Sequence, residues 1–305
     1  MQSINKGSDK TGGIRTRVKK MEILQAENTI CPPPESMKIE VSADCNLKCS
    51  FCFHKDSKHQ GLMTLGDFKK AVKIAHDENI PQVGLLFLGE PTTNPELPEM
   101  IRVAKEDYGI PYVFITTNGI MSSKMLDSIM NSKLDSLKWS INHYNRASFK
   151  NGTGVDGFDV LMQNIRRAAA RNPNGIKLYA SSAVYDVDNV APEMKAFIDT
   201  EVKPHVYEHY YFKINNQGGL IHDSHFDITH CNRLPVLPCP RLFNNTYITH
   251  DLHVAMCCSA FTDDFIIGDL RKQTFQEIWN GERMQALRKA HLSGNIGNTI
   301  CGGAR

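Results

Sequence analysis

Residues 37–52, MKIEVSADCNLKCSFC, place three closely spaced cysteines directly after a short apolar stretch. Residues 37–42 are predicted to form a strand, so Cys45, Cys49 and Cys52 are expected on the loop that follows it. Cysteines so close together on one loop can converge on a single metal cluster, because thiolates are the ligands of iron–sulfur clusters. Three ligands on a four-iron cluster leave one iron open, as in a reacting metal site.

A structural zinc site is the alternative interpretation of this loop. Structural zinc takes four protein ligands, and His54, two residues after Cys52, could be the fourth. The strand–helix pattern around the loop and the motifs further along the chain favour the iron cluster.

Short apolar runs alternate with amphipathic stretches over the next part of the chain. The predicted strands cover residues 37–42, 83–88, 112–119, 134–141, 177–185 and 208–214, and the predicted helices cover 65–79, 94–109, 122–132, 157–172 and 191–202. This alternation predicts right-handed βαβ units and a parallel sheet. Six units are fewer than the eight of a closed barrel, so the expected fold is α/β, an open, partial (β/α)6 TIM-like barrel. Its functional groups are expected at the carboxyl ends of the strands.

The chain divides into three parts by sequence character. Residues 1–35 have little periodicity and are expected to form a mobile or draped N-terminal arm, and residues 36–218 are expected to form the barrel. Residues 219–305 contain a predicted hairpin at 246–258 and a predicted amphipathic helix at 273–294. They are expected to form a small α+β appendage, which holds five of the nine cysteines.

The overall composition excludes several classes of protein. The chain has 305 residues, 41% of them hydrophobic and 22% charged, which excludes collagen-like, coiled-coil and largely disordered chains. A net charge of +2 gives no strong field for nucleic acid, and no apolar run reaches the roughly 18 residues of a membrane span. No signal peptide is recognised at the start, so the cysteines are expected to be metal ligands or catalytic groups in a reducing cytoplasm.

The cysteine loop resembles the signature of the radical S-adenosylmethionine (SAM) superfamily, C-x3-C-x-aromatic-C, with Phe51 in the aromatic position. The resemblance implies that Cys45, Cys49 and Cys52 bind a [4Fe–4S] cluster whose fourth iron is chelated by the amino and carboxylate groups of SAM. One-electron reduction, from a flavodoxin- or ferredoxin-type donor, would then yield methionine and a 5′-deoxyadenosyl radical that takes a hydrogen atom from the substrate.

The end of the second predicted strand, Leu88-Gly89-Glu90, resembles the Gly-Gly-Glu motif of the same family, with Leu88 in place of the first glycine. Glycine lets a backbone approach a ligand, and a carboxylate at a strand end can accept hydrogen bonds from an ammonium group. The resemblance implies that Gly89 and Glu90 bind the amino group of SAM. An ordinary strand-to-loop turn is the alternative.

Three further strand ends carry polar residues. Asn118 follows the third strand in a Thr-Asn-Gly motif, and Ser140 and Asn142 end the fourth, where the family often has Ser-x-Asp. The resemblance implies contacts of these residues with SAM, and of Lys213, at the end of the sixth strand, with SAM or substrate. Capping or turn chemistry explains each one singly, but motifs at consecutive strand ends favour a common pocket.

The C-terminal cysteines resemble the SPASM/twitch appendage of radical SAM enzymes. The resemblance implies a second, auxiliary iron–sulfur cluster on Cys239, Cys257 and Cys301, with Cys258, a non-cysteine group or the substrate as the fourth ligand. The turn at 250–253 has no glycine and the final C-x2-C is missing, which departs from the pattern. A structural zinc site or a lost cluster is the alternative.

Two cysteines are candidates for a catalytic role. Some radical SAM epimerases return a hydrogen atom to the substrate from a thiol, and Cys231 or Cys258 could do so if it faces the pocket. A buried or surface thiol without a catalytic role is the alternative for both.

The expected function is that of a radical SAM enzyme that abstracts a hydrogen atom from a polar small molecule of carbohydrate or aminoglycoside type, leading to oxidation or epimerisation. One alternative is a peptide maturase, against which we count that only 35 residues precede the first strand. The other is a non-catalytic iron–sulfur or zinc module, against which the three-cysteine loop, Phe51 and Glu90 argue.

Overall fold

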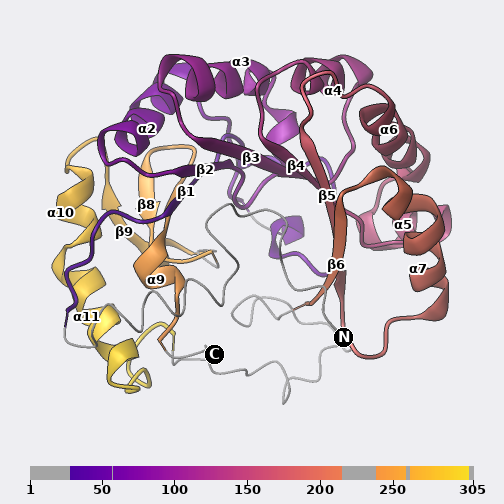
Figure 1. The fold of residues 1–305 in the computed structure, drawn as a ribbon. Coiled ribbons are helices and arrows are strands. Elements are labelled where there is room, and N and C mark those ends of the chain that lie inside the picture. Colours follow the sequence, from indigo (N-terminus) through magenta and orange to yellow (C-terminus); the bar gives the residue numbers. More distant parts are fainter. Residues whose placement is uncertain (1–27, 57, 215–237, 259–261, 302–305) are drawn as a thin grey trace.

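The computed structural model describes residues 28–56, 58–214, 238–258 and 262–301. Its strands form one curved sheet in the order β6-β5-β4-β3-β2-β1-β7-β8-β9 (Figure 1). Strands β6 and β9 are the two edges, so the sheet is not closed. This confirms the prediction of a partial barrel.

The first six strands are parallel and adjacent in chain order. They are β1 (Ser36–Ile39), β2 (Gln82–Leu85), β3 (Tyr112–Thr117), β4 (Ser136–Ser140), β5 (Lys177–Val184) and β6 (Glu208–Lys213). The observed ends of all six lie within three residues of the predicted ones. All their carboxyl ends therefore meet at one rim of the barrel.

The helices lie on the outer, convex side of the sheet (Figure 1). They are α2 (Leu65–Asp77), α3 (Leu97–Arg102), α4 (Ser123–Met130), α6 (Phe158–Ala170) and α7 (Pro192–Phe197). The predicted helices 94–109 and 191–202 continue beyond α3 and α7 as π-helical turns, at Val103–Asp107 and Ile198–Val202. Helix α5 (Arg146–Thr153), which begins at a capping box formed by Asn145 and Ser148, was not predicted.

Alternation along the strands separates the core from the inner face of the barrel. In β1, Met37 and Ile39 are fully buried in the main hydrophobic core, and in β4 Leu137 and Trp139 are fully buried in it too. The residues between them therefore point to the opposite, concave face. Trp139 and Trp279 are both core residues.

The C-terminal segment extends the same sheet. Strand β7 (Asn245–Ile248) lies parallel to β1, and β8 (His253–Ala255) and β9 (Ile266–Asp269) follow in antiparallel order. Strands β7 and β8 confirm the predicted hairpin, whereas β9 was not predicted. A short helix, α9 (Arg241–Asn244), precedes β7.

The prediction of a single helix over 273–294 was wrong. The segment forms α10 (Phe275–Trp279) and α11 (Glu282–Leu292), which are separated by Asn280 and Gly281. A side chain at Gly281 would place its Cβ 2.6 Å from the carbonyl oxygen of Glu277, so the chain turns sharply there.

The described end of the N-terminal arm is draped over these two helices. The Cys31 amide donates to the Asn280 side chain at 2.9 Å, and the Trp279 indole donates to the Pro32 carbonyl at 2.9 Å. Arg288, which is fully buried, donates to the Thr29 carbonyl at 3.0 Å. None of the helices in the described part of the chain combines the length and apolarity that crossing a bilayer requires.

Candidate active site

The three-cysteine loop lies at the carboxyl end of β1 and is held by α5. The Lys48 amide donates to the carbonyl of Thr153, and the Ser50 amide donates to the carbonyl of Gly152, both at 2.9 Å. Within the loop, the Cys52 amide donates to the Cys49 carbonyl at 3.0 Å, so the chain turns back on itself. The unpredicted helix α5 therefore positions the loop.

The three thiols influence one another's ionisation. Burial raises the pKa of Cys49 to about 12, and the charges of Cys52 and Cys45 act in the same direction. Burial also raises the pKa of Cys45 to about 11, with contributions from Glu90 and Cys52. The protein alone thus keeps these thiols protonated, whereas a bound metal would deprotonate them.

The three thiols do not by themselves form a compact site for a single ion. Four thiolates around one zinc ion, with bonds of about 2.3 Å, lie only about 3.8 Å apart. Among the described residues, the three thiols are not a group whose ligand atoms all lie within 4.8 Å of one another. His54, the fourth ligand of the zinc alternative, has its Nε2 2.5 Å from the carbonyl oxygen of Ala43, so this nitrogen is already hydrogen-bonded.

Phe51 links the cysteine loop to the far side of the barrel. Its ring packs against Ala183 at the end of β5 and Ile214 after β6, and lies 6.4 Å from the ring of His143. The aromatic residue of the motif therefore connects the loop after β1 with the ends of β5 and β6.

Gly89 lies where the end of β2 meets the segment after β1. A Cβ at this position would lie 2.4 Å from the Ser42 carbonyl oxygen and 2.6 Å from that of Asp44. Only glycine permits this approach of two backbones.

Glu90 is buried, and its carboxylate is surrounded by protein donors. Thr92 donates through its amide at 3.1 Å and its hydroxyl at 2.7 Å, Thr117 through its hydroxyl at 2.7 Å, and Asn118 through its amide at 2.7 Å. The pKa of Glu90 is raised, because the effect of burial exceeds the opposite effect of these hydrogen bonds. The carboxylate therefore ties the ends of β2 and β3 together.

Asn118 lies against the cysteine loop. Its side-chain amide donates to the Asn46 side chain at 2.8 Å and lies 4.0 Å from the Cys45 sulfur. The side-chain amide of Asn46 in turn donates to the Ile120 carbonyl at 2.7 Å. Glu90, Asn118 and Cys45 are thus brought together at the ends of three neighbouring strands.

The other predicted pocket residues lie further round the rim. Asn142 accepts a hydrogen bond from the Ala183 amide at 2.8 Å, so it joins the ends of β4 and β5. Ser140 is half-buried and pairs in register with Ser181. Lys213 is exposed at the end of β6, where its charge adds to the hydrogen bonds from Asn189 and the Asp188 amide that lower the pKa of Asp186.

Four C-terminal cysteines gather beside the start of β7. Burial raises the pKa of Cys301 to about 11, and the charge of Cys239 adds to this rise. The charges of Cys258, Cys257 and Cys239 all raise the pKa of Arg241. As in the core, no three of these thiols lie within 4.8 Å of one another among the described residues.

The two cysteines with a predicted catalytic role differ in what the structure says of them. Cys231 lies outside the described residues. Cys258 packs against Tyr247 and Ala255, together with Phe87 from beyond the end of β2. It is therefore close to residues of the concave face.

The sequence analysis missed two lysines on the concave face. Lys38, in β1, donates to Ser36 at 2.8 Å and to Asn245, and lies 5.9 Å from the ring centre of Phe114. Lys138, in β4, donates to the Tyr210 hydroxyl at 2.9 Å. The available signal was a lysine between two apolar residues in each strand, MKI and LKW.

Comparison with protein families gives two matches. The radical SAM superfamily matches residues 39–180, and SPASM, an iron–sulfur cluster-binding domain, matches residues 239–302. Among curated proteins, the GTP 3',8-cyclase of Chlorobaculum tepidum is 29% identical over 143 residues, which are 47% of this chain and 43% of that protein. A probable GTP 3',8-cyclase of Saccharolobus solfataricus is 31% identical over 137 residues, 45% of this chain and 44% of that protein. The chain thus spans less than half the length of these relatives.

Solved structures share the fold over most of the chain. BtrN in complex with AdoMet and 2-DOIA has a TM-score of 0.61 at 17% identity, and the superposition covers 90% of this chain and 93% of the BtrN chain. Streptococcus suis SuiB bound to S-adenosylmethionine has a TM-score of 0.69 at 14% identity, over 89% of this chain and 70% of its own. The enzyme anSMEcpe with bound AdoMet has a TM-score of 0.62 at 15% identity, over 88% of both chains.

The class of protein follows from two features. The partial barrel has three thiols after its first strand, and a second group of cysteines follows β6. Both features are typical of an iron–sulfur enzyme. The chain belongs to the radical SAM superfamily and carries a C-terminal SPASM domain. Its cofactors are accordingly a core [4Fe–4S] cluster and SAM, with auxiliary iron–sulfur ligation in the SPASM domain.

Proposed function

We propose that this radical SAM enzyme abstracts a hydrogen atom from a polar, carbohydrate-type small molecule bound inside the barrel. The proposal includes oxidation or epimerisation as the overall reaction. The observation that carries it is the pair of lysines, with aromatic rings beside them, on the concave face of the sheet.

The two lysines give the concave face donors, positive charge and flat apolar surfaces. The Lys38 ammonium lies over the rings of Phe114 and Tyr247, at 5.9 and 6.0 Å, and the Lys138 ammonium lies over Tyr210 at 5.5 Å. Hydroxyl, carboxylate or phosphate groups accept from ammonium groups, and the rings offer faces for C–H groups. A cationic aminoglycoside would face like charges here, so a neutral or anionic sugar is favoured.

The rim above this face holds the groups that would bind SAM. When bound, the core cluster and SAM supply a 5′-deoxyadenosyl radical after one-electron reduction. Glu90 fixes the ends of β2 and β3, and Gly89 lets the backbone of β2 approach the cysteine loop. Phe51, Gly89, Glu90, Asn118, Ser140 and Asn142 remain our proposed cofactor contacts, and Lys213 remains our proposed contact with SAM or substrate.

The fate of the substrate radical depends on what lies beside it. In an oxidation the radical loses an electron and a proton, whereas in an epimerisation it regains a hydrogen atom from a thiol. Cys258 is the described thiol that packs beside Tyr247 of the concave face, so it is our candidate for that donor. Cys231 is the other candidate from the sequence.

A peptide is the second candidate substrate. Two of the structural relatives are described with peptides: SuiB with the precursor peptide SuiA, and anSMEcpe with the Cp18Cys peptide. The name GTP 3',8-cyclase belongs to relatives that match less than half of this chain, so it supports the SAM-cleaving core rather than a substrate.

The test uses the full chain, reconstituted anaerobically with iron and sulfide and incubated with dithionite and SAM. Carbon-deuterated sugars and peptides are supplied in separate reactions, and deuterium in 5′-deoxyadenosine is measured by mass spectrometry. Label from a sugar supports the proposal, and label from peptides alone supports the second candidate. Intact clusters with no release of 5′-deoxyadenosine would favour a non-catalytic module.

A variant pair tests the concave face. Lys38→Met should lower the fraction of released 5′-deoxyadenosine that carries deuterium from the substrate, because it removes the ammonium and keeps a similar shape. Lys73→Met is the matched control, since Lys73 is exposed on α2, on the outer side of the sheet, and pairs with Asp77. Equal coupling in both variants would contradict a substrate site at Lys38.

A further inference from the structure

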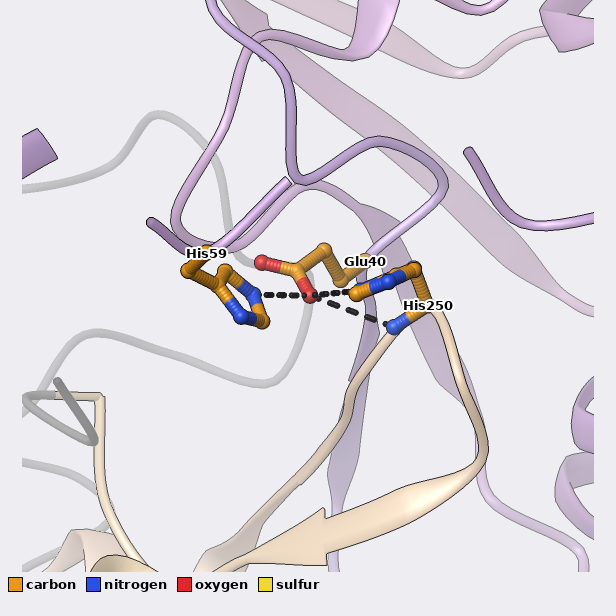
Figure 2. A group of neighbouring side chains, drawn as sticks. All are labelled: Glu40, His59 and His250. Atoms are coloured by element: carbon orange, nitrogen blue, oxygen red, sulfur yellow. Dashed lines mark hydrogen bonds and ion pairs between the residues drawn. The ribbon is translucent and has the colours of Figure 1, made fainter. Parts of the chain in front are cut away.

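A second group of metal-ligating side chains lies apart from the cysteines, at the rim between β1 and β7. Glu40 directly follows β1, His59 lies in the segment before α2, and His250 lies in the turn between β7 and β8. Figure 2 shows the three side chains converging. Among the described residues they form the only group of three such ligands whose donor atoms all lie within 4.8 Å of one another.

We propose that Glu40, His59 and His250 bind one divalent transition-metal ion, zinc or ferrous iron, at a site separate from both iron–sulfur centres. Two imidazoles and one carboxylate are the ligands of His2Glu zinc sites, which keep a fourth position for water. Ferrous ions take the same donor set. This inference does not depend on the substrate proposed above.

The distances between the ligand atoms suit such an ion. Nε2 of His59 lies 2.8 Å and Nδ1 of His250 lies 3.2 Å from the same carboxylate oxygen of Glu40. Metal–ligand bonds of about 2.0–2.1 Å in tetrahedral geometry separate ligand atoms by about 3.3 Å. The two histidine nitrogens would move about 0.5 and 0.1 Å away from that oxygen to reach this separation, and all three ligand atoms already lie within 4.8 Å of one another.

Neighbouring groups hold two of the ligands in place. The other oxygen of Glu40 accepts from the Leu88 amide at 3.3 Å, and the His250 amide donates to the shared oxygen at 3.1 Å. Gly61 has a φ of 135°, and a Cβ there would lie 2.6 Å from Nε2 of His250. The absence of a side chain at Gly61 thus makes room for the ligand ring, as outer groups do in metal sites.

The charges around the group also favour a cation. The Glu40 side chain is fully buried, and although burial raises its pKa, hydrogen bonds from His250 and His59 leave the pKa lowered. Asp251 and Asp263 lie near enough to raise the pKa of His59, after the larger effect of Glu40. A buried carboxylate needs a positive partner; a protonated His59 can supply that charge, and a divalent ion bound by the neutral imidazoles would replace the proton.

The site would join the two parts of the protein that the family comparisons define. Glu40 and His59 lie within the radical SAM match, and His250 lies within the SPASM match. The side chains of His59 and His250 are 29% and 16% exposed, so water can reach the remaining coordination position. A bound ion would fasten the β7–β8 turn to the strand that carries the cysteine loop.

The test uses the full chain with its iron–sulfur clusters intact. One equivalent of ZnCl2 is added anaerobically, and retained zinc is measured after gel filtration. Zinc X-ray absorption should show nitrogen and oxygen ligands at about 2.0–2.1 Å and no sulfur at about 2.3 Å. His59→Ala should lower the zinc affinity more than about tenfold, since even outer groups of metal sites contribute that much.

His253→Ala is the matched control, because His253 lies in the same hairpin but pairs with Asp251 and Arg271 instead of Glu40. It should bind zinc as the unaltered protein does, and all three proteins should keep the same iron–sulfur absorption. In protein isolated without added zinc, a high-spin ferrous Mössbauer signal that His59→Ala removes would identify iron as the ion.

Sulfur ligands to zinc, or equal zinc binding by His59→Ala and the control, would overturn the proposal. If His59→Ala loses its clusters, X-ray absorption of the unaltered protein decides alone.

Discussion

Replacing Glu90 with glutamine tests whether one buried carboxylate holds the ends of β2 and β3. Its oxygens accept four hydrogen bonds, from the amide and hydroxyl of Thr92, the hydroxyl of Thr117 and the amide of Asn118. A glutamine can keep its carbonyl oxygen toward the two threonines. Its NH2 group then faces the Asn118 amide, which also donates.

The change should destabilise the fold by the loss of one buried acceptor. Leaving a buried N–H without a partner costs about 1–3 kcal/mol. An unfolding entropy of about 2.1 cal/mol/K per residue gives roughly 1.5 °C per kcal/mol for 305 residues, so Tm should fall by about 2–5 °C. Release of 5′-deoxyadenosine should also fall, because Asn118 lies against the cysteine loop.

The assay is circular dichroism melting of anaerobic, cluster-loaded protein at one scan rate. Glu99→Gln is the control, because Glu99 is 45% exposed and pairs with Arg102 in the same helix. It should leave Tm unchanged. If Glu90→Gln melts and cleaves SAM as the unaltered protein does, the carboxylate is not the acceptor that organises this rim.

Three other substitutions probe the cysteine centres and the approach of the backbones. Gly89→Ala should prevent cluster loading, because its Cβ would lie 2.4 Å from the Ser42 carbonyl oxygen; normal iron content would contradict the close approach. Cys49→Ala should remove about four iron atoms per chain and abolish 5′-deoxyadenosine release, and any remaining release would show that the loop assignment is wrong. Cys301→Ala should lower iron content and substrate turnover while sparing slow, uncoupled SAM cleavage, and unchanged iron would remove Cys301 from the auxiliary ligands.

The strands and the cysteine loop could be predicted because their signals are local. Each apolar run, such as residues 83–88, indicates a strand without information from distant parts of the chain. The loop's cysteines lie within eight residues of one another. The break between α10 and α11 was not predicted, although it depends on a local feature: Gly281 has no Cβ, which would meet the Glu277 carbonyl. Sequence periodicity passes over it because apolar residues continue at helical spacing on both sides.

Features formed by distant residues could not be predicted. The pairing of β1 with β7 joins residues 36–39 to 245–248, and nothing in either segment indicates its partner. The same pairing brings His250 to Glu40. The ligands of this group come from three separate segments, so no fixed spacing in the sequence predicts that they meet. The four donors around Glu90 come from Thr92, Thr117 and Asn118, and no local pattern predicts that they meet; the contact of Glu90 with SAM stays a prediction.

The place of β1 between β2 and β7 also matters for how the protein is made. A ribosome must add about 200 residues after β1 before β7 exists, which takes roughly 10–40 s at bacterial rates of elongation. During that time one edge of the strand beside the cysteine loop has no neighbour, and open edges promote aggregation. We therefore expect slow expression at low temperature, or added chaperones, to raise the yield of protein able to take up iron.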